Sequence, residues 1–124
     1  MAVVLPAANS HPSGVPRVGD MFWVDTTVYG GNKKPTRPVV VVRVPNDVLP
    51  DALVVTRTSM DEMQGRHVKH PADPGLALDR DGAFAKLYQR RIDVRFFAMP
   101  QYVRYQGQLP EPYLGQVLQM VGMA

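Results

Sequence analysis

The stretch that decides the fold is residues 17–44, which read RVGDMFWVDTTVYGGNKKPTRPVVVVRV. Its compact, aromatic-rich run Met21–Val24 predicts a strand that enters a core, and a Gly-Gly pair farther on ends the segment. A polar, basic loop broken by proline follows. The nearly unbroken valine run Pro38–Val44 is typical of a central strand covered on both faces. The stretch therefore predicts two buried strands joined by a basic loop.

Short elements separated by turns are predicted on the C-terminal side of this stretch. A turn at residues 45–51 leads into the β-branched strand Leu53–Thr58, which forms a hairpin with the valine run. Val68 lies among charged residues, a pattern typical of an exposed edge strand. The other predicted elements are the strands Gly75–Leu78, Gly82–Tyr88 and Gln101–Gln108, and a single helix over Glu111–Met120.

The length of 124 residues corresponds to one domain. We expect residues 1–16 to form a flexible, proline-rich arm and residues 17–124 to form the folded domain. The 12 prolines and 10 glycines argue against a helical bundle or a coiled coil, because they interrupt long helices. The predicted fold is mainly β, a small, bent, partly open barrel with a C-terminal α-helix. The pattern alone leaves an SH3-like barrel and an OB-fold as alternatives.

The composition excludes several kinds of chemistry. With no cysteine, the chain has no disulfide framework, iron–sulfur cluster or thiolate nucleophile, and three histidines offer little material for a metal site. We therefore expect no metal and no cofactor. A net charge of +3 fits an anionic partner without requiring one. We expect a cytoplasmic protein, because the first five residues are too short for a signal sequence and no apolar run approaches a membrane span.

The order of motifs resembles the MazF/PemK family of toxin endoribonucleases. The resemblance covers about residues 17–121, and its most specific part pairs the Gly-Asp-x-x-Trp-Val-Asp opening with Thr-Arg-Pro-Val-Val-Val. It implies an SH3-like barrel with a C-terminal helix, a homodimer, and metal-independent cleavage of single-stranded mRNA until a cognate antitoxin peptide blocks it. The matching pieces are Val18-Gly19-Asp20, Phe22-Trp23-Val24-Asp25, Gly30, Thr36-Arg37-Pro38 with the valines after it, Val54-Val55, Thr58-Ser59, Ile92-Asp93 and the helix Leu114–Val121.

The same resemblance implies three catalytic residues. Arg37 and Thr58 match positions that the family uses at the scissile phosphate, and Ser59 lies beside them. Cleaving RNA without a metal uses the ribose 2′-hydroxyl as nucleophile, so a site must orient it, move its proton and stabilise the charged phosphorane. An arginine fork and a hydroxyl donor suit the last task. Singly, such residues are more often solvated cations or local caps, and only their joint occurrence favours a site.

Cations and aromatic residues near these positions are candidate RNA contacts. Cations bind phosphates, and aromatic faces stack unpaired bases. The rings of Phe96, Phe97, Tyr102 and Tyr105 are assigned first to the core or a dimer contact, and Trp23 to the core. Met60 and Met63 belong to a loop expected to cover the site. The candidate RNA-binding residues are Asn32, Lys33, Lys34, Lys86, Tyr88, Arg90 and Arg91.

The chain departs from the family at its usual carboxylates. Glu-Gln is usual where Gly31–Pro35 stands, and an acidic residue is usual near Leu87-Tyr88. His67 and His70 are possible replacements in proton transfer, although their first interpretation is as solvated residues of an edge strand. The alternative function is therefore a catalytically impaired relative that binds RNA or a protein partner. A CcdB-like gyrase poison and an OB-type single-strand binder are further alternatives.

Overall fold

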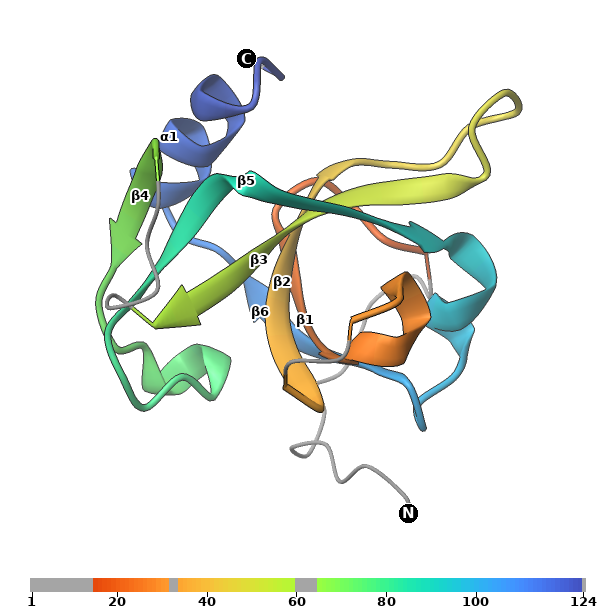
Figure 1. The fold of residues 1–124 in the computed structure, drawn as a ribbon, viewed down its shortest axis with the longest axis horizontal. Helices are drawn as coiled ribbons and strands as arrows, with labels where there is room; N and C mark the ends of the chain where they lie inside the picture. Colours follow the sequence, from red (N-terminus) through yellow and green to blue (C-terminus); the bar gives the residue numbers. More distant parts are fainter. Residues whose placement is uncertain (1–14, 32–33, 60–64, 124) are drawn as a thin grey trace.

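The computed structural model describes residues 15–31, 34–59 and 65–123. Its strands form one antiparallel sheet in the order β4-β5-β3-β2-β1-β6 (Figure 1). The strands are β1 Asp20–Asp25, β2 Thr36–Arg43, β3 Asp51–Ser59, β4 His67–His70, β5 Gly82–Asp93 and β6 Val103–Gln108. The helical elements are η1 Thr26–Tyr29, η3 Pro74–Leu76, η4 Val94–Ala98 and α1 Tyr113–Met120.

The mainly β class and the C-terminal helix are confirmed, and so is the hairpin of the valine run with β3. The sheet is strongly bent, but the described strands do not close into a barrel, because β4 and β6 remain its two edges. The pairing register shifts once between β2 and β3 and once between β3 and β5. Such bulges increase the local twist of a strand and redirect its side chains.

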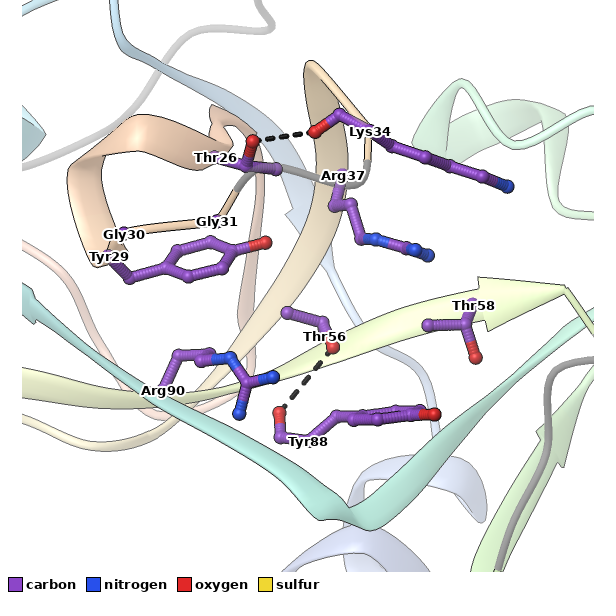
Figure 2. A pocket seen from close by; sticks show the side chains of 10 residues that line it. All are labelled: Thr26, Tyr29, Gly30, Gly31, Lys34, Arg37, Thr56, Thr58, Tyr88 and Arg90. Carbon is purple, nitrogen blue, oxygen red and sulfur yellow. Dashed lines mark hydrogen bonds between the residues drawn. The ribbon is translucent and has the colours of Figure 1, made fainter.

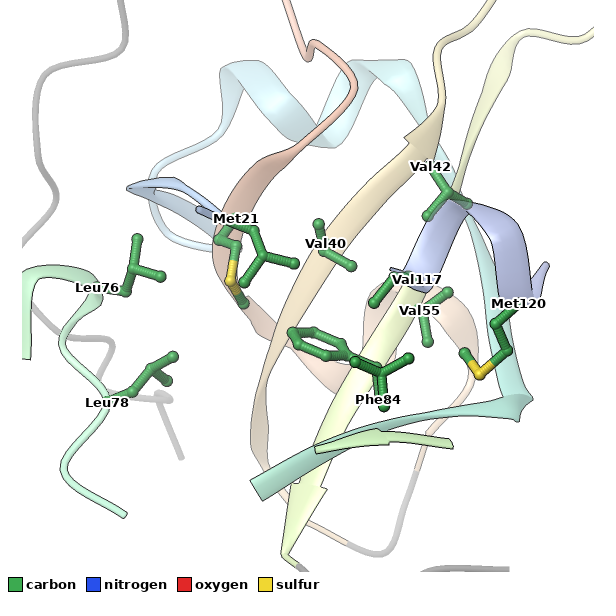
Figure 3. Close-up of a cluster of buried hydrophobic side chains, with 11 residues drawn as sticks. Met21, Val40, Val42, Val55, Leu76, Leu78, Phe84, Val117 and Met120 are labelled. Carbon is green, nitrogen blue, oxygen red and sulfur yellow. The ribbon is translucent and has the colours of Figure 1, made fainter. Parts of the chain in front are cut away.

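The valine run lies in the middle of the sheet and contributes buried side chains to both faces of the sheet. Val40 and Val42 belong to one buried cluster, whereas Val39 and Val41 belong to another. This division follows from the alternation of side chains along a strand. The first cluster lies between the sheet and α1, where Val117 and Phe84 pack with the valines (Figure 3). The predicted central strand with two covered faces is therefore confirmed.

The Phe84 side chain is the largest of the completely buried groups and belongs to the first cluster. We expect Phe84→Ala to lower the free energy of unfolding by about 3–5 kcal/mol, because the change removes buried surface and leaves a cavity. Urea denaturation measures the loss. Leu87→Ala on the same strand is the control, since Leu87 is 63% exposed and its removal should change stability by about 0.5 kcal/mol or less. Equal losses in the two variants would contradict this assignment of the core.

Two predicted strands differ from the structure. Residues 75–78 do not form a strand: η3 and the single bridge between Asp73 and Leu78 stand there instead. The predicted strand Gly82–Tyr88 is the first part of one strand that reaches Asp93. Val68 does lie on the edge strand β4, but it is buried rather than exposed, because α1 packs against β4.

The aromatic residues near the C-terminal half belong to the second cluster, as the first interpretation of the sequence proposed. Phe22 meets Phe97 and Tyr105 edge to face, with ring centroids 5.0 and 5.5 Å apart. Phe96 and Tyr102 form a similar pair at 5.5 Å. Trp23 is half-buried and packs against the first cluster instead.

Some sequence predictions fall outside the described residues. They are the greater part of the arm 1–16, the candidate RNA contacts Asn32 and Lys33, and the loop methionines Met60 and Met63. Among the helices that the structure describes, none has the length and apolar character needed to cross a membrane.

Candidate active site

A pocket of about 370 Å³ opens where η1, β2, β3 and β5 meet (Figure 2). The pocket is rich in cations, aromatic rings and hydroxyl groups. None of the described residues that line it carries a carboxylate or an imidazole. Its lining consists of Thr26, Tyr29, Gly30, Gly31, Lys34, Arg37, Thr56, Thr58, Tyr88 and Arg90. This combination suits a polyanion with flat, unpaired rings, such as single-stranded nucleic acid.

The register of β2 and β3 explains why Arg37 and Thr58 share this pocket. Val39 pairs directly with Thr56 across the two antiparallel strands, so their side chains lie on the same face. Arg37 lies two residues before Val39, and Thr58 lies two residues after Thr56. Because side chains alternate with a period of two, both return to that face at neighbouring positions.

The loop between β1 and β2 is fixed by a dense set of hydrogen bonds. Asp25 caps η1 by accepting from the backbone N–H of Thr27 at 3.0 Å and from its hydroxyl at 2.7 Å. The Thr26 hydroxyl donates to the Lys34 carbonyl at 2.6 Å (Figure 2). Gly30 ends η1 at φ +80°, a conformation that favours glycine. These contacts hold Tyr29 and Lys34 at the pocket wall.

Arg90 stands between two tyrosine rings. Its guanidinium carbon lies 5.8 Å from the centroids of both Tyr29 and Tyr88, within the range of a cation–π interaction. Burial raises the pKa of the Tyr29 hydroxyl, and the charges of Arg37 and Arg90 oppose that shift. The phenol is therefore protonated at neutral pH and has a proton to donate, and Figure 2 shows it pointing toward Arg37.

The two pocket threonines differ in their hydrogen bonding. The Thr56 hydroxyl donates to the Tyr88 carbonyl across a long 3.5 Å contact. Thr58 is only 5% exposed, and its hydroxyl oxygen has no hydrogen-bond partner in the described part of the chain. An unpaired buried hydroxyl costs about 1–3 kcal/mol, so an oxygen atom brought by a ligand can satisfy it after a rotation of the side chain.

The comparisons with known proteins connect this geometry to a fold. No protein-family model matches the sequence, and no curated protein matches it significantly. The crystal structure of MazF (Form-I) from Deinococcus radiodurans is similar, with a TM-score of 0.62 and 23% identity over 87% of this chain and 94% of that chain. The MazE-MazF structure (Form-II) from the same organism gives 0.60 and 22% over 87% and 92%. The chain has the MazF fold. The Form-III MazE-MazF structure agrees, with a TM-score of 0.59 and 21% identity over 89% and 99%.

Within the MazF fold, five of the candidate residues line one pocket: Lys34, Arg37, Thr58, Tyr88 and Arg90. Ser59 lines an adjoining cleft together with Arg37 and Thr58.

Two other candidate RNA contacts lie elsewhere. Lys86 lines a separate hollow with Arg66 and Leu87. Arg91 is exposed, and alternation along β5 turns it away from the side of Arg90. Within residues 15–31, 34–59 and 65–123, no group of three or more His, Cys, Asp or Glu side chains could hold a metal ion.

The expectation that His70 is solvated is wrong. Its side chain is 1% exposed, because β4 is covered by α1 and the imidazole meets the Tyr113 ring edge to face at 4.9 Å. His67 is half-buried, and its Nδ1 lies 3.0 Å from the Gly65 carbonyl. Neither histidine lines the pocket. His70 is therefore a core residue of this chain and does not lie where it could carry a proton for the pocket.

Sequence reasoning missed Arg57, which lies between the two pocket threonines. Its side chain is buried, and its Nε donates to Nδ1 of His70 at 3.0 Å. Its Nη2 donates to the carbonyls of His70, Pro71 and Arg80 at 3.0, 3.3 and 2.7 Å. A cation in the middle of a β-branched, apolar strand was the signal available in the sequence. Arg57 ties β3 to the segment that precedes β5.

The Arg57 contact predicts how stability depends on pH. Burial lowers the pKa of His70, the nearby Arg57 charge lowers it further, and Asp73, with Oδ2 3.5 Å from Nε2, opposes the shift. The unfolded chain therefore binds a proton more readily than the folded chain. The contribution of neutral His70 to stability is fully present above the unfolded pKa of about 6.5. It is lost as the pH falls below that value toward the lower pKa of the folded state.

We accordingly expect the melting temperature to fall between about pH 7.5 and about pH 5.5, and to fall less in His70→Asn. An asparagine oxygen can take the place of Nδ1 as acceptor for Arg57 without titrating. His67→Asn, on the same strand, is the matched control and should keep the wild-type slope. A His70→Asn variant with the full wild-type slope would assign the pH dependence to other groups.

Proposed function

We propose that this chain is a MazF-like toxin, an endoribonuclease (a hydrolase of RNA phosphodiester bonds) that cleaves single-stranded RNA without a metal ion. The observation that carries the proposal is that Arg37 and Thr58, far apart in the sequence, line one pocket with Lys34 and Arg90. The MazF fold supports it. Three cations among the described lining residues favour a phosphate group in that pocket.

The proposed reaction is an attack of the ribose O2′ on the adjacent phosphorus. The O2′–P bond forms and the P–O5′ bond breaks, which leaves a 2′,3′-cyclic phosphate and a 5′-hydroxyl. Arg37 holds the phosphate oxygens with its planar fork and stabilises the extra negative charge of the phosphorane. The Thr58 hydroxyl donates a further hydrogen bond to the same group.

Two protons must move in this reaction. The proton of the attacking 2′-hydroxyl passes to water, because the described pocket lining has no carboxylate or imidazole to accept it. The leaving O5′ receives a proton, for which the protonated Tyr29 phenol is a donor within the pocket. We therefore expect cleavage that is slower than in a site with a dedicated base.

The preference for single strands follows from the tyrosines. A base stacks on the face of Tyr88 only when it is unpaired, and Arg90 and Lys34 attract the backbone that carries it. Binding should weaken as salt is raised, because the cations displace counterions from the phosphates.

The test is incubation of the purified protein with a mixed-sequence RNA in EDTA. The expected result is a set of discrete fragments that end in 2′,3′-cyclic phosphate and begin with a 5′-hydroxyl. A 2′-O-methyl copy of the same RNA should stay intact, because its nucleophile is blocked. Cleavage of that copy, or products with other ends, would contradict the proposed mechanism.

The absence of a proton acceptor among the described lining residues also favours a second candidate function, a catalytically impaired relative that binds RNA or a protein partner. In that case RNA stays intact in the cleavage assay but shifts on a gel in a salt-dependent manner. Growth of cells after induction of the protein also distinguishes the two candidate functions, since only the active enzyme should arrest growth.

We further propose that the chain works in the cytoplasm as a homodimer and is blocked by an antitoxin peptide. Two of the similar structures pair MazF with MazE, which supports a partner of that kind. Sedimentation velocity measures the oligomeric state. Co-expression with a short acidic reading frame next to the gene should give a complex that no longer cuts RNA.

A further inference from the structure

A second cleft, of about 300 Å³, adjoins the candidate active site. Lys34, Arg37 and Thr58 line both hollows, so the wall between them is the position proposed above for the phosphate. A strand of RNA whose phosphate lies on that wall has one neighbouring nucleotide on each side. The first pocket and the second cleft are therefore placed to receive the two nucleotides that flank the reacting phosphate.

The second cleft differs from the first pocket in having carboxylates in its lining. Asp79 and Asp81 line it with Arg80 between them, and we call the segment Asp79–Asp81 the acidic wall. Asp81 is engaged, since its Oδ1 accepts from the backbone N–H of Ala72 at 2.9 Å. The Asp79 side chain is exposed and has no hydrogen bond or ion pair with any residue of the described ranges. A carboxylate repels a phosphate but accepts hydrogen bonds from the amino group of a base.

The acidic wall is held rigidly. The carbonyl of Arg80 accepts from Arg57 at 2.7 Å, and Leu78 is buried and exchanges two backbone hydrogen bonds with Asp73 at 2.8 and 3.0 Å. The segment that carries Asp79 is thus fixed at both sides. A preformed acceptor binds its ligand without the entropy cost of ordering a loop.

Two further polar groups at the cleft lack partners. The Thr58 hydroxyl, on a side chain that is 5% exposed, and the indole N–H of Trp23 are both buried without a hydrogen bond to the described residues. Buried polar groups in folded proteins are nearly always paired. The Thr58 hydroxyl is assigned above to the reacting phosphate. The Trp23 indole N–H lies in the lining of the cleft apart from the acidic wall, and it independently indicates a polar ligand there.

We propose that the second cleft binds the base of a nucleotide next to the reacting phosphate, and that Asp79 accepts hydrogen bonds from a base with an exocyclic amino group. Guanine is the best match, because its N1–H and N2 amino group lie side by side and meet both oxygens of one carboxylate. Adenine and cytosine offer the amino group alone. This inference rests on the proposed function, since the phosphate position defines the neighbouring nucleotide.

The test uses 2′-O-methyl hexanucleotides, which cannot be cut by attack of the 2′-oxygen. Alternating uridine–guanosine is compared with alternating uridine–inosine, because inosine lacks only the 2-amino group. We expect the guanosine probe to bind about tenfold more tightly. In Asp79→Asn the ratio should fall to about one, while the affinity for oligouridine stays equal or rises, because a negative charge beside the backbone is removed.

Asp47→Asn is the matched control, because it removes the same charge from the β2–β3 turn, on the opposite side of the molecule from η3 (Figure 1). It should keep the guanosine preference. The inference is overturned if the wild type does not distinguish guanosine from inosine, or if Asp79→Asn retains the full preference. Both results leave the proposed function intact as long as unmodified RNA is cut. Failure of every probe to bind, together with uncut RNA, would overturn both.

Discussion

Replacing Arg37 by alanine is expected to reduce RNA cleavage by about 10²–10³-fold, the usual loss when one donor to a developing oxyanion is removed. Arg37 lies where β2 begins, in a pocket whose described lining residues offer cations and hydroxyls but no carboxylate. Stabilisation of the phosphorane charge is therefore the main contribution that this pocket can make. Initial rates on one RNA at saturating concentration measure the effect.

The controls for Arg37→Ala separate charge, geometry and folding. Arg37→Lys keeps the positive charge but loses the planar fork, so its rate should remain well below the wild type. Arg95→Ala removes an exposed arginine that pairs with Asp93 at 3.0 Å, and it should cut within about twofold of the wild-type rate. Wild-type cleavage by Arg37→Ala would remove this residue from the mechanism and leave the binding function as the better description.

Replacing Arg57 by alanine is expected to lower the free energy of unfolding by about 3 kcal/mol or more. The change leaves Nδ1 of His70 and three backbone carbonyls without their donor in a buried region. The acceptors of its four hydrogen bonds are neutral. Burial lowers the pKa of Arg57, and Asp81 and Asp73 oppose that shift. Chemical denaturation monitored by the fluorescence of Trp23 measures the loss.

A matched arginine tests whether this loss is specific to the buried network. Arg91→Ala on β5 removes an exposed side chain and should change stability by about 0.5 kcal/mol or less. Cleavage by Arg57→Ala, measured where the variant is still folded, should also fall, since Arg57 lies between the pocket threonines Thr56 and Thr58. An Arg57→Ala variant as stable as the wild type would show that the four hydrogen bonds contribute little.

The sequence was most informative where a pattern has one physical solution. The valine run predicted a strand covered on both faces, and the apolar spacing within Glu111–Met120 predicted the helix that the structure has over Tyr113–Met120. The segment before β5 was harder, because Gly75–Leu78 is as apolar as a short strand. Pro74 and Gly75 are accommodated by the first turn of η3 instead.

The site was only partly predictable. Arg37 and Thr58 meet because β2 and β3 pair in one register, and the family resemblance already contained that information. Lys86 and Arg91 did not join them, because the bulge and the alternation in β5 fix which of its side chains face the pocket. Burial of His70 depends on α1 packing over β4, a contact between distant segments that no local pattern reports.

The division of β2 between two cores has a consequence for the evolution and engineering of this chain. A single-residue insertion or deletion within Val39–Val42 would turn the side chains beyond it to the opposite face of the sheet. Valines of the first cluster would then point into the second and the reverse, so both clusters would lose their packing at once. Changes in length should instead be tolerated in the turn after β2, where Val48 is 84% exposed. That turn is the place at which a fluorescent label or a peptide tag can be grafted.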